Sequence, residues 1–276
     1  MTSQTDAAVA PDGTSLLVRS WAASGQPWGV VLLVHGLSEH SGRYEQVGEW
    51  MAEAGLAVSA YDHRGFGGSG GRRGHVDSWS QLISDLESRV RAVRRPGLPL
   101  ILYGHSMGGL ICVEYAASER PQPDLMVLSA PGLSSGHPRY LRWMAGVLGR
   151  VVPHFVPPLP EGDFSVLSRD AAVGEAFRVD PMAVHAQTAR FGLEAFSAQR
   201  RASAVLGRVR VPPLVIHGSD DRLVPPSASA PLAALPNVER RLYPGLRHEL
   251  HNEPEGRQVV ADVVAWLRAQ LEDTTA

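Results

Sequence analysis

The chain has 276 residues, of which 44% are hydrophobic and 20% charged, as in an ordinary globular protein that buries a sizeable core. Its net charge of -2 argues against nucleic acid as a main partner. The single cysteine, Cys112, cannot form an internal disulfide, no apolar run approaches the length of a membrane span, and residues 1–11 lack the pattern of a secretory signal. We therefore expect a cytoplasmic protein.

Short apolar runs alternate with amphipathic segments through the first half of the chain. The runs predict strands at residues 16–21, 30–34, 56–61, 100–103 and 125–129. The segments between them predict helices at residues 44–54, 80–94 and 110–117. Strands that alternate with helices need crossover connections, which are right-handed and place helices on both faces of the sheet. The fold class that we expect is α/β, with a mainly parallel, doubly wound sheet.

The alternation stops between residues 134 and 207, where prolines are frequent and no convincing buried strand occurs. Apolar side chains are concentrated at residues 141–156. We interpret residues 134–207 as a largely helical cap, or lid, inserted between two parts of the core, residues 1–133 and 208–276. The alternative is that these helices are extra parts of the core. The excess of apolar residues favours a surface for a greasy ligand or for a membrane.

Strands and helices return after this segment. We predict a strand at residues 213–217, a helix at 227–235, a last strand at 238–243 and a closing helix at 255–271. The loops that follow the two strands hold aspartates and histidines. Because the carboxyl ends of parallel strands meet at one edge of a sheet, these polar side chains are expected at that edge.

The pattern G-x-S-x-G occurs three times, around Ser69, Ser106 and Ser134. Only Ser106 has a strand ending directly before it and a helix starting directly after it, which is the context of a nucleophile elbow. In such a turn the serine backbone is strained, and glycines two residues away on each side avoid a clash. We therefore predict Ser106 as a nucleophile, the alternative being a plain Gly-Ser-Gly turn.

A nucleophilic serine needs a histidine base, held in the right tautomer by a carboxylate. In doubly wound hydrolases these residues follow in the order Ser, Asp or Glu, His. Asp221 stands at the usual position for this carboxylate, between a strand-ending glycine and a Val-Pro pair, whereas Asp220 suits a turn. His248 lies at the usual distance after the last strand, with His251 as its competitor. The predicted triad is Ser106, Asp221 and His248.

An oxyanion hole requires two N–H donors. We expect one from the backbone amide of Met107, directly after the nucleophile. The other is expected from the loop after residues 30–34, at Leu37. Since the backbone donates, both assignments rest on position alone. This chemistry needs neither a cofactor nor a metal.

Several stretches match one known family. They are the run His-Gly-Leu-Ser-Glu-His-Ser-Gly-Arg-Tyr at 35–44, Asp-His-Arg-Gly-Phe-Gly-Gly-Ser at 62–69, Gly-His-Ser-Met-Gly-Gly at 104–109, Ser-Val-Leu-Ser-Arg at 165–169, and the loops with Asp221 and His248. On these residues, and over nearly its whole length, the chain resembles the monoacylglycerol lipase family of α/β-hydrolases. The Glu-His-Ser-Gly-Arg-Tyr run is the most specific, because generic esterases lack it.

The resemblance implies an α/β-hydrolase fold with a helical cap that forms an apolar tunnel for an acyl chain. It also implies that Glu39, Arg43 and His251 line a polar pocket for the glycerol end of the substrate. The alternative for these three residues is a surface Glu-Arg pair and a solvated histidine. The cap sequence is otherwise divergent, so a preference for acyl length does not carry over.

The leading functional hypothesis is hydrolysis of a fatty-acid ester of glycerol, most simply monoacylglycerol, through an acyl-enzyme. A lysophospholipase or a broad carboxylesterase would use the same chemistry. From another class, the chain could be a non-catalytic ligand receptor on the same scaffold. The partner that we expect is a lipid ester substrate, with transient membrane or micelle contact through the cap.

Overall fold

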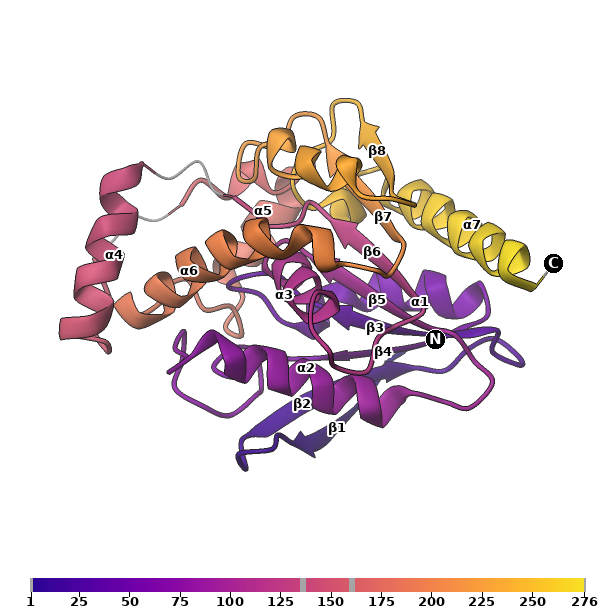
Figure 1. Ribbon diagram of the computed structural model, residues 1–276, viewed down its shortest axis with the longest axis horizontal. Helices are drawn as coiled ribbons and strands as arrows, with labels where there is room; N and C mark the ends of the chain where they lie inside the picture. Colours follow the sequence, from indigo (N-terminus) through magenta and orange to yellow (C-terminus); the bar gives the residue numbers. More distant parts are fainter. Residues whose placement is uncertain (1, 135–137, 159–161, 276) are drawn as a thin grey trace.

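The computed structural model describes residues 2–134, 138–158 and 162–275 (Figure 1). Within them an eight-stranded sheet has the order β1-β2-β4-β3-β5-β6-β7-β8. The strands are β1 (Gln4–Val9), β2 (Ser15–Trp21), β3 (Gly29–Val34), β4 (Leu56–Tyr61), β5 (Leu100–His105), β6 (Leu125–Ser129), β7 (Pro213–Gly218) and β8 (Glu239–Tyr243). Neighbouring strands from β4 through β8 pair in parallel, and only the β1–β2 and β2–β4 pairs are antiparallel. The prediction of a mainly parallel sheet is confirmed.

Helices cover both faces of this sheet. They are α1 (Glu45–Glu53), α2 (Trp79–Val93), α3 (Met107–Ala116), α4 (Arg139–Val151), α5 (Ala171–Val179), α6 (Ala189–Val205) and α7 (Gly256–Thr275). One apolar core lies under α2 and α3 and includes Leu86 and Ile111, and the other lies under α1 and α7 and includes Met51 and Trp266. Because helices pack on both sides, every residue of β3 through β7 is buried.

The segment interpreted as a cap is helical and contains no strand wherever the structure describes it. Helix α6 buries Phe191, Ala198 and Ala202 in the same core as α2 and α3, whereas α4 packs on α6. Figure 1 shows α4 at the outer end of the molecule, and there Trp143 remains 70% exposed. The segment thus combines both interpretations, with α6 adding to the core and α4 lying outside it. The boundaries at residues 134 and 207 stay a prediction.

Three elements differ from the prediction. The helix expected at residues 227–235 is two short 3-10 turns, η4 (Pro226–Ala228) and η5 (Ala230–Ala234), because Pro231 has no N–H for an α-helical hydrogen bond. Strand β1 was not predicted, since its residues are mostly exposed and carry no apolar pattern. Helix α3 begins at Met107, three residues before the predicted start, because two glycines conceal its first turn. No helix in the described part of the chain combines the length and apolarity needed to cross a bilayer.

Candidate active site

Ser106 lies in a strained turn between β5 and α3. Its backbone has φ 49° and ψ -115°, a region that L-residues other than glycine rarely adopt. A Cβ at Gly104 would lie 2.7 Å from the carbonyl oxygen of Gly108, and a Cβ at Gly108 would lie 2.0 Å from that of Val34. Both positions therefore require glycine. Ser106 itself is partly exposed, whereas its neighbours on either side are buried.

The other two motif serines have different surroundings. The Ser69 hydroxyl donates to the carbonyl oxygen of Asp62 at 2.6 Å and accepts from the amide of Leu17 at 2.9 Å. It is buried and ties a loop to β2, so it is not available as a nucleophile. Ser134 precedes residues 135–137, which lie outside the described residues, and the next helix starts only at residue 139. Neither serine has the strand-turn-helix context.

Asp221 and His248 form a buried pair. The Nδ1 atom of His248 lies 2.7 Å from Oδ2 of Asp221 and must carry the proton, because the carboxylate only accepts. Oδ1 of Asp221 accepts from the amides of Leu223 and Val224, both at 2.9 Å. Burial would raise the pKa of Asp221, but hydrogen bonds from histidines hold it well below its ordinary value. Asp220 is exposed and accepts only from the Ser219 hydroxyl among the described side chains.

The loops after β5, β7 and β8 bring these side chains to one edge of the sheet. The ring of His105, directly before Ser106, lies 4.8 Å from the ring of His248. The loop with the predicted base therefore packs against the elbow with the predicted nucleophile. Nδ1 of His248 is engaged with Asp221, so its Nε2 atom is the one available to take a proton.

The predicted oxyanion loop follows β3 and also touches the elbow. A Cβ on Gly36 would lie 3.2 Å from Cβ of Ser106, so the chain carrying Leu37 passes directly beside the nucleophile. Neither the Leu37 amide nor the Met107 amide donates to another group within the described residues. Both amides therefore remain candidates for the two donors that an oxyanion at Ser106 would need.

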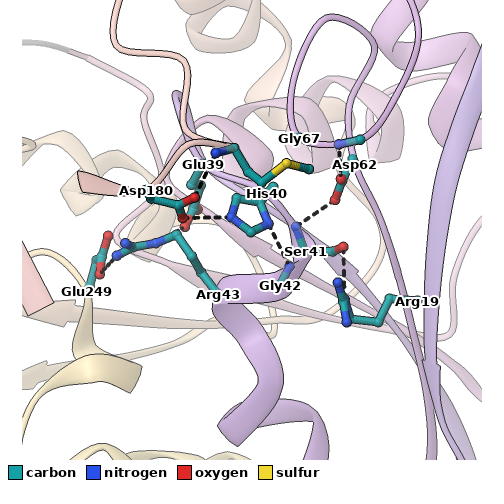
Figure 2. A network of polar contacts seen from close by, with 12 residues as sticks. Arg19, Glu39, His40, Ser41, Gly42, Arg43, Asp62, Gly67, Asp180 and Glu249 are labelled. Atoms are coloured by element: carbon teal, nitrogen blue, oxygen red, sulfur yellow. Dashed lines mark hydrogen bonds and ion pairs between the residues drawn. The ribbon is translucent and has the colours of Figure 1, made fainter. Parts of the chain in front are cut away.

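The part of the chain after α5 holds this loop from outside. Ser38, which has φ 69°, accepts at its carbonyl from the amide of Val184 (2.9 Å) and at its hydroxyl from Nε2 of Gln187 (2.8 Å). Nε2 of His40 lies 2.8 Å from Oδ2 of Asp180, and Figure 2 shows this pair reaching from one segment to the other. The position of the oxyanion loop is therefore coupled to the position of residues 180–188.

Glu39 is buried and Arg43 is partly buried, and the two side chains are bonded to each other. Glu39 accepts from the amide of Gly36, from the Tyr44 hydroxyl at 2.8 Å, and from Nε of Arg43 at 3.3 Å. Nη2 of Arg43 donates to Glu249 at 2.5 Å, as Figure 2 shows. Burial and the nearby Glu249 raise the pKa of Glu39, while Arg43 overcomes the effect of burial and keeps the pKa of Glu249 below its ordinary value.

His251 is fully buried beside this pair. Its ring is stacked on Tyr44 at 4.9 Å and lies edge-on to His105 at 5.1 Å. Neither ring nitrogen has a hydrogen-bond partner within the described residues. Burial lowers the pKa of His251 to about 4, so at neutral pH it presents one donor and one acceptor. Such an imidazole can donate a hydrogen bond to a hydroxyl group at one nitrogen and accept one at the other.

Two residues that the sequence prediction did not single out also take part. His217, the last side chain of β7, lies 3.1 Å from Oδ2 of Asp221, and Glu249 directly follows the predicted base. The signal for His217 is a polar residue ending an apolar strand just before the predicted acid. Within the described ranges, no group of three or more His, Cys, Asp or Glu side chains is arranged to hold a metal ion.

Comparison with known proteins gives matches along most of the chain. The family described as serine aminopeptidase, S33, matches residues 25–255. The monoacylglycerol lipase of Mycolicibacterium smegmatis is 38% identical over 272 residues, which cover 94% of this chain and 95% of that protein. The monoglyceride lipase of Homo sapiens is 34% identical, with coverage of 93% and 88%. The crystal structure of the Paleococcus ferrophilus monoacylglycerol lipase has a TM-score of 0.82 at 31% identity and covers 91% of this chain and 98% of its own.

Proposed function

The chain belongs to the monoacylglycerol lipase family of α/β-hydrolases, and we propose that it hydrolyses monoacylglycerol to glycerol and a free fatty acid. The observation that carries this proposal is the strained Ser106 elbow, packed against the buried Asp221–His248 pair. The likeness to proteins named monoacylglycerol lipase supports glycerol as the alcohol part of the ester.

In the first half of the reaction, Nε2 of His248 takes the Ser106 proton as Oγ attacks the ester carbonyl carbon. The amides of Leu37 and Met107 donate to the oxygen that becomes negative. Asp221 stabilises the imidazolium of His248 through Nδ1. When the carbon–oxygen bond to glycerol breaks, the leaving oxygen takes the proton from Nε2, and the acyl group stays on Ser106.

Water completes the reaction. His248 takes a proton from the water as its oxygen attacks the acyl carbon, and the same two amides hold the oxyanion. When this second tetrahedral intermediate collapses, Oγ of Ser106 leaves with the proton from Nε2, and the fatty acid departs. The cycle returns every group to its starting state and requires no cofactor.

The predicted glycerol pocket of Glu39, Arg43 and His251 remains part of the proposal, with unequal roles. The ring nitrogens of His251, which have no hydrogen-bond partner among the residues that the structure describes, support its binding to a glycerol hydroxyl. The Glu39 carboxylate is occupied by Gly36, Tyr44 and Arg43, which supports a role in holding the oxyanion loop.

The proposal also includes a cytoplasmic enzyme that touches lipid surfaces transiently through α4. On this helix Tyr140, Trp143 and Val151 are each at least 60% exposed, a grouping that suits insertion among lipid chains. The single cysteine, Cys112, is buried and free, in keeping with a reducing compartment.

The test is the Ser106→Ala protein assayed on a short nitrophenyl ester and on monoacylglycerol. We expect turnover of both to fall by roughly 10⁶-fold, toward the background rate, because the nucleophile is lost. Circular dichroism checks that the fold persists, and a fluorophosphonate probe should label only the unaltered protein. Retained turnover would show that another residue is the nucleophile. A strong preference for lysophospholipid over monoacylglycerol would overturn the choice of substrate.

A further inference from the structure

We propose that His217 is a positioning residue of the active site, which donates a hydrogen bond from Nε2 to the catalytic carboxylate of Asp221 and so sets how strongly that carboxylate polarises His248. The inference rests on the proposed function, because it assigns Asp221 and His248 their triad roles. It adds a second imidazole on the same carboxylate oxygen, contributed by a different part of the chain.

The geometry places two histidines on one oxygen atom. Oδ2 of Asp221 lies 2.7 Å from Nδ1 of His248 and 3.1 Å from Nε2 of His217. His217 comes from the end of β7, while His248 comes from the loop after β8. The side chains of His217 and Asp221 are fully buried, so water does not compete for this oxygen.

The direction of donation follows from the partners of His217. Its Nε2 atom faces two groups that only accept, Oδ2 of Asp221 and the carbonyl oxygen of Val224 at 2.9 Å, so Nε2 must carry a proton. Its Nδ1 atom lies 2.9 Å from the Ser229 hydroxyl, which also accepts from Nε of Arg240 at 3.1 Å. The Ser229 hydroxyl also lies 3.1 Å from the carbonyl oxygen of Pro226, so it is the two acceptors at Nε2 that fix the tautomer of His217 and leave Nδ1 as an acceptor.

The four hydrogen bonds to Asp221 explain why it stays ionised while buried. Two backbone amides occupy Oδ1, and the two imidazoles share Oδ2. A donor that shares Oδ2 withdraws charge from the bond to His248. Removing that donor leaves more negative charge for His248, stabilises its imidazolium and raises the pH at which the base becomes available.

Other charged and titratable groups face this site and stay the same in the variants below. His105 and His251 lie on the elbow side of His248, and Glu249 with Arg43 lies next to it in the chain and in space. Arg240 lies behind Ser229. Any difference between two substitutions at position 217 therefore reports on the contact from that position alone.

A matched pair of substitutions separates the effects of the contacts that the two ring nitrogens of His217 make. The amide nitrogen of glutamine can replace Nε2, so His217→Gln keeps the donor to Asp221. The shorter asparagine replaces only Nδ1, so His217→Asn keeps the Ser229 contact and loses the donor to Asp221. His75→Gln is the control, because His75 is a buried histidine that bonds to Thr188 and Asp77, away from the triad.

The readout is the pH profile of kcat/KM on a soluble nitrophenyl ester. For His217→Asn we expect the acid limb to move up by about half a pH unit, because the imidazolium of His248 is stabilised. For His217→Gln and His75→Gln the acid limb should stay at its original pH. An unmoved limb in His217→Asn, or an equal shift in His217→Gln, overturns the inference.

Proton NMR gives a readout that does not depend on turnover. The low-field resonance of the His248 Nδ1–H proton should move in His217→Asn and keep its position in His217→Gln, and an identical position in both contradicts the inference. If the unaltered protein hydrolyses no ester, the proposed function fails while this measurement still decides the contact. Should His217→Asn not fold, Ser229→Ala takes its place, and we expect a smaller shift in the same direction because the ring of His217 loses its contact at Nδ1 and is held less firmly against Asp221.

Discussion

At Ser106 the backbone stores strain that the surrounding residues maintain. A non-glycine residue at φ 49° and ψ -115° costs on the order of 1–3 kcal/mol. The amide of Ser106 donates to Ser129 at 2.9 Å, and its carbonyl accepts from Gly132 at 2.8 Å, so β6 and the segment directly after it hold the turn. The result is a hydroxyl that stays accessible among buried neighbours.

The carboxylate of Glu39 could serve either as a ligand for the substrate or as a support for the oxyanion loop, and substitutions distinguish these two roles. In Glu39→Ala the Gly36 amide and the Tyr44 hydroxyl lose their acceptor, and the oxyanion loop loses its support. We expect kcat to fall by about 10²-fold on monoacylglycerol and on a nitrophenyl ester alike, since in the proposed mechanism both substrates use the Leu37 amide. Steady-state kinetics on the two substrates measures this.

The comparison substitution is Glu39→Gln, whose amide oxygen still accepts from Gly36 and should retain much of the rate. If Glu39→Ala instead impaired only the glycerol ester, with normal kinetics on the nitrophenyl ester, the carboxylate would be a glycerol ligand and not a support for the loop.

Among the elements between β6 and β7, helices α4 and α6 have different roles. Helix α6 packs on α3 and contributes to the core, whereas α4 rests on α6 and turns large apolar side chains outward. When such residues move from water into an apolar phase, the free energy falls by about 1.5–3 kcal/mol for each large side chain. The position of α4 at the outer end of the molecule leaves it accessible to a lipid surface (Figure 1).

The double substitution Trp143→Asp and Val147→Asp should therefore weaken binding to phosphatidylcholine vesicles that contain monoacylglycerol by at least about tenfold, because two side chains lose their partition into lipid. Co-sedimentation measures the binding, and kinetics on a soluble nitrophenyl ester should stay normal. Val9→Asp on β1 removes a similarly exposed apolar side chain away from the cap and serves as the control. Equal vesicle binding by all three proteins would rule out contact through α4.

For the molecule as a whole, a group of buried neutral histidines makes stability depend on pH. Burial lowers the pKa of His35 to about 3 and of His251 to about 4, and it also holds those of His63 and His105 well below the ordinary value. In the unfolded chain the pKa of each of these histidines is about 6.5. Between that pH and about 4 the unfolded chain binds protons that the folded chain does not, so stability falls as the pH falls through this window.

We expect the urea midpoint to drop steadily from pH 7 to pH 4.5, because the free energy of unfolding falls by up to about 1.4 kcal/mol per pH unit for each histidine. Glu39 opposes this trend, because its raised pKa lets the folded chain take up a proton. His251→Phe, which keeps the packing against Tyr44, should make the slope shallower. A midpoint that does not change over this range would contradict the burial of neutral histidines.

Much of the architecture could be predicted because its signals are local. The strand-turn-helix around Ser106 depends on residues within about ten positions, and the glycine at 104 is required by contacts within that turn. The glycine at 108 is also part of the motif, although the atom that requires it is the carbonyl oxygen of Val34 on a neighbouring strand. Strand β1 and the turns at residues 226–234 were missed for equally local reasons: an exposed strand has no apolar pattern, and a proline in a helical composition blocks the α-helix. The functional roles of the predicted triad and oxyanion amides remain predictions, to be tested by the substitutions above.

The sequence by itself determined the alternation of strands and helices, the elbow and the order of the candidate catalytic residues, because each depends on short-range spacing and polarity. Only the tertiary structure decided that His217 shares an oxygen of Asp221, that Arg43 reaches Glu249 across 206 positions, and that residues 180–188 hold the oxyanion loop. These contacts depend on where loops from separate strands meet at one edge of the sheet. Side-chain type and spacing along the chain do not by themselves indicate these contacts, since the contacts are set by the packing of the whole molecule.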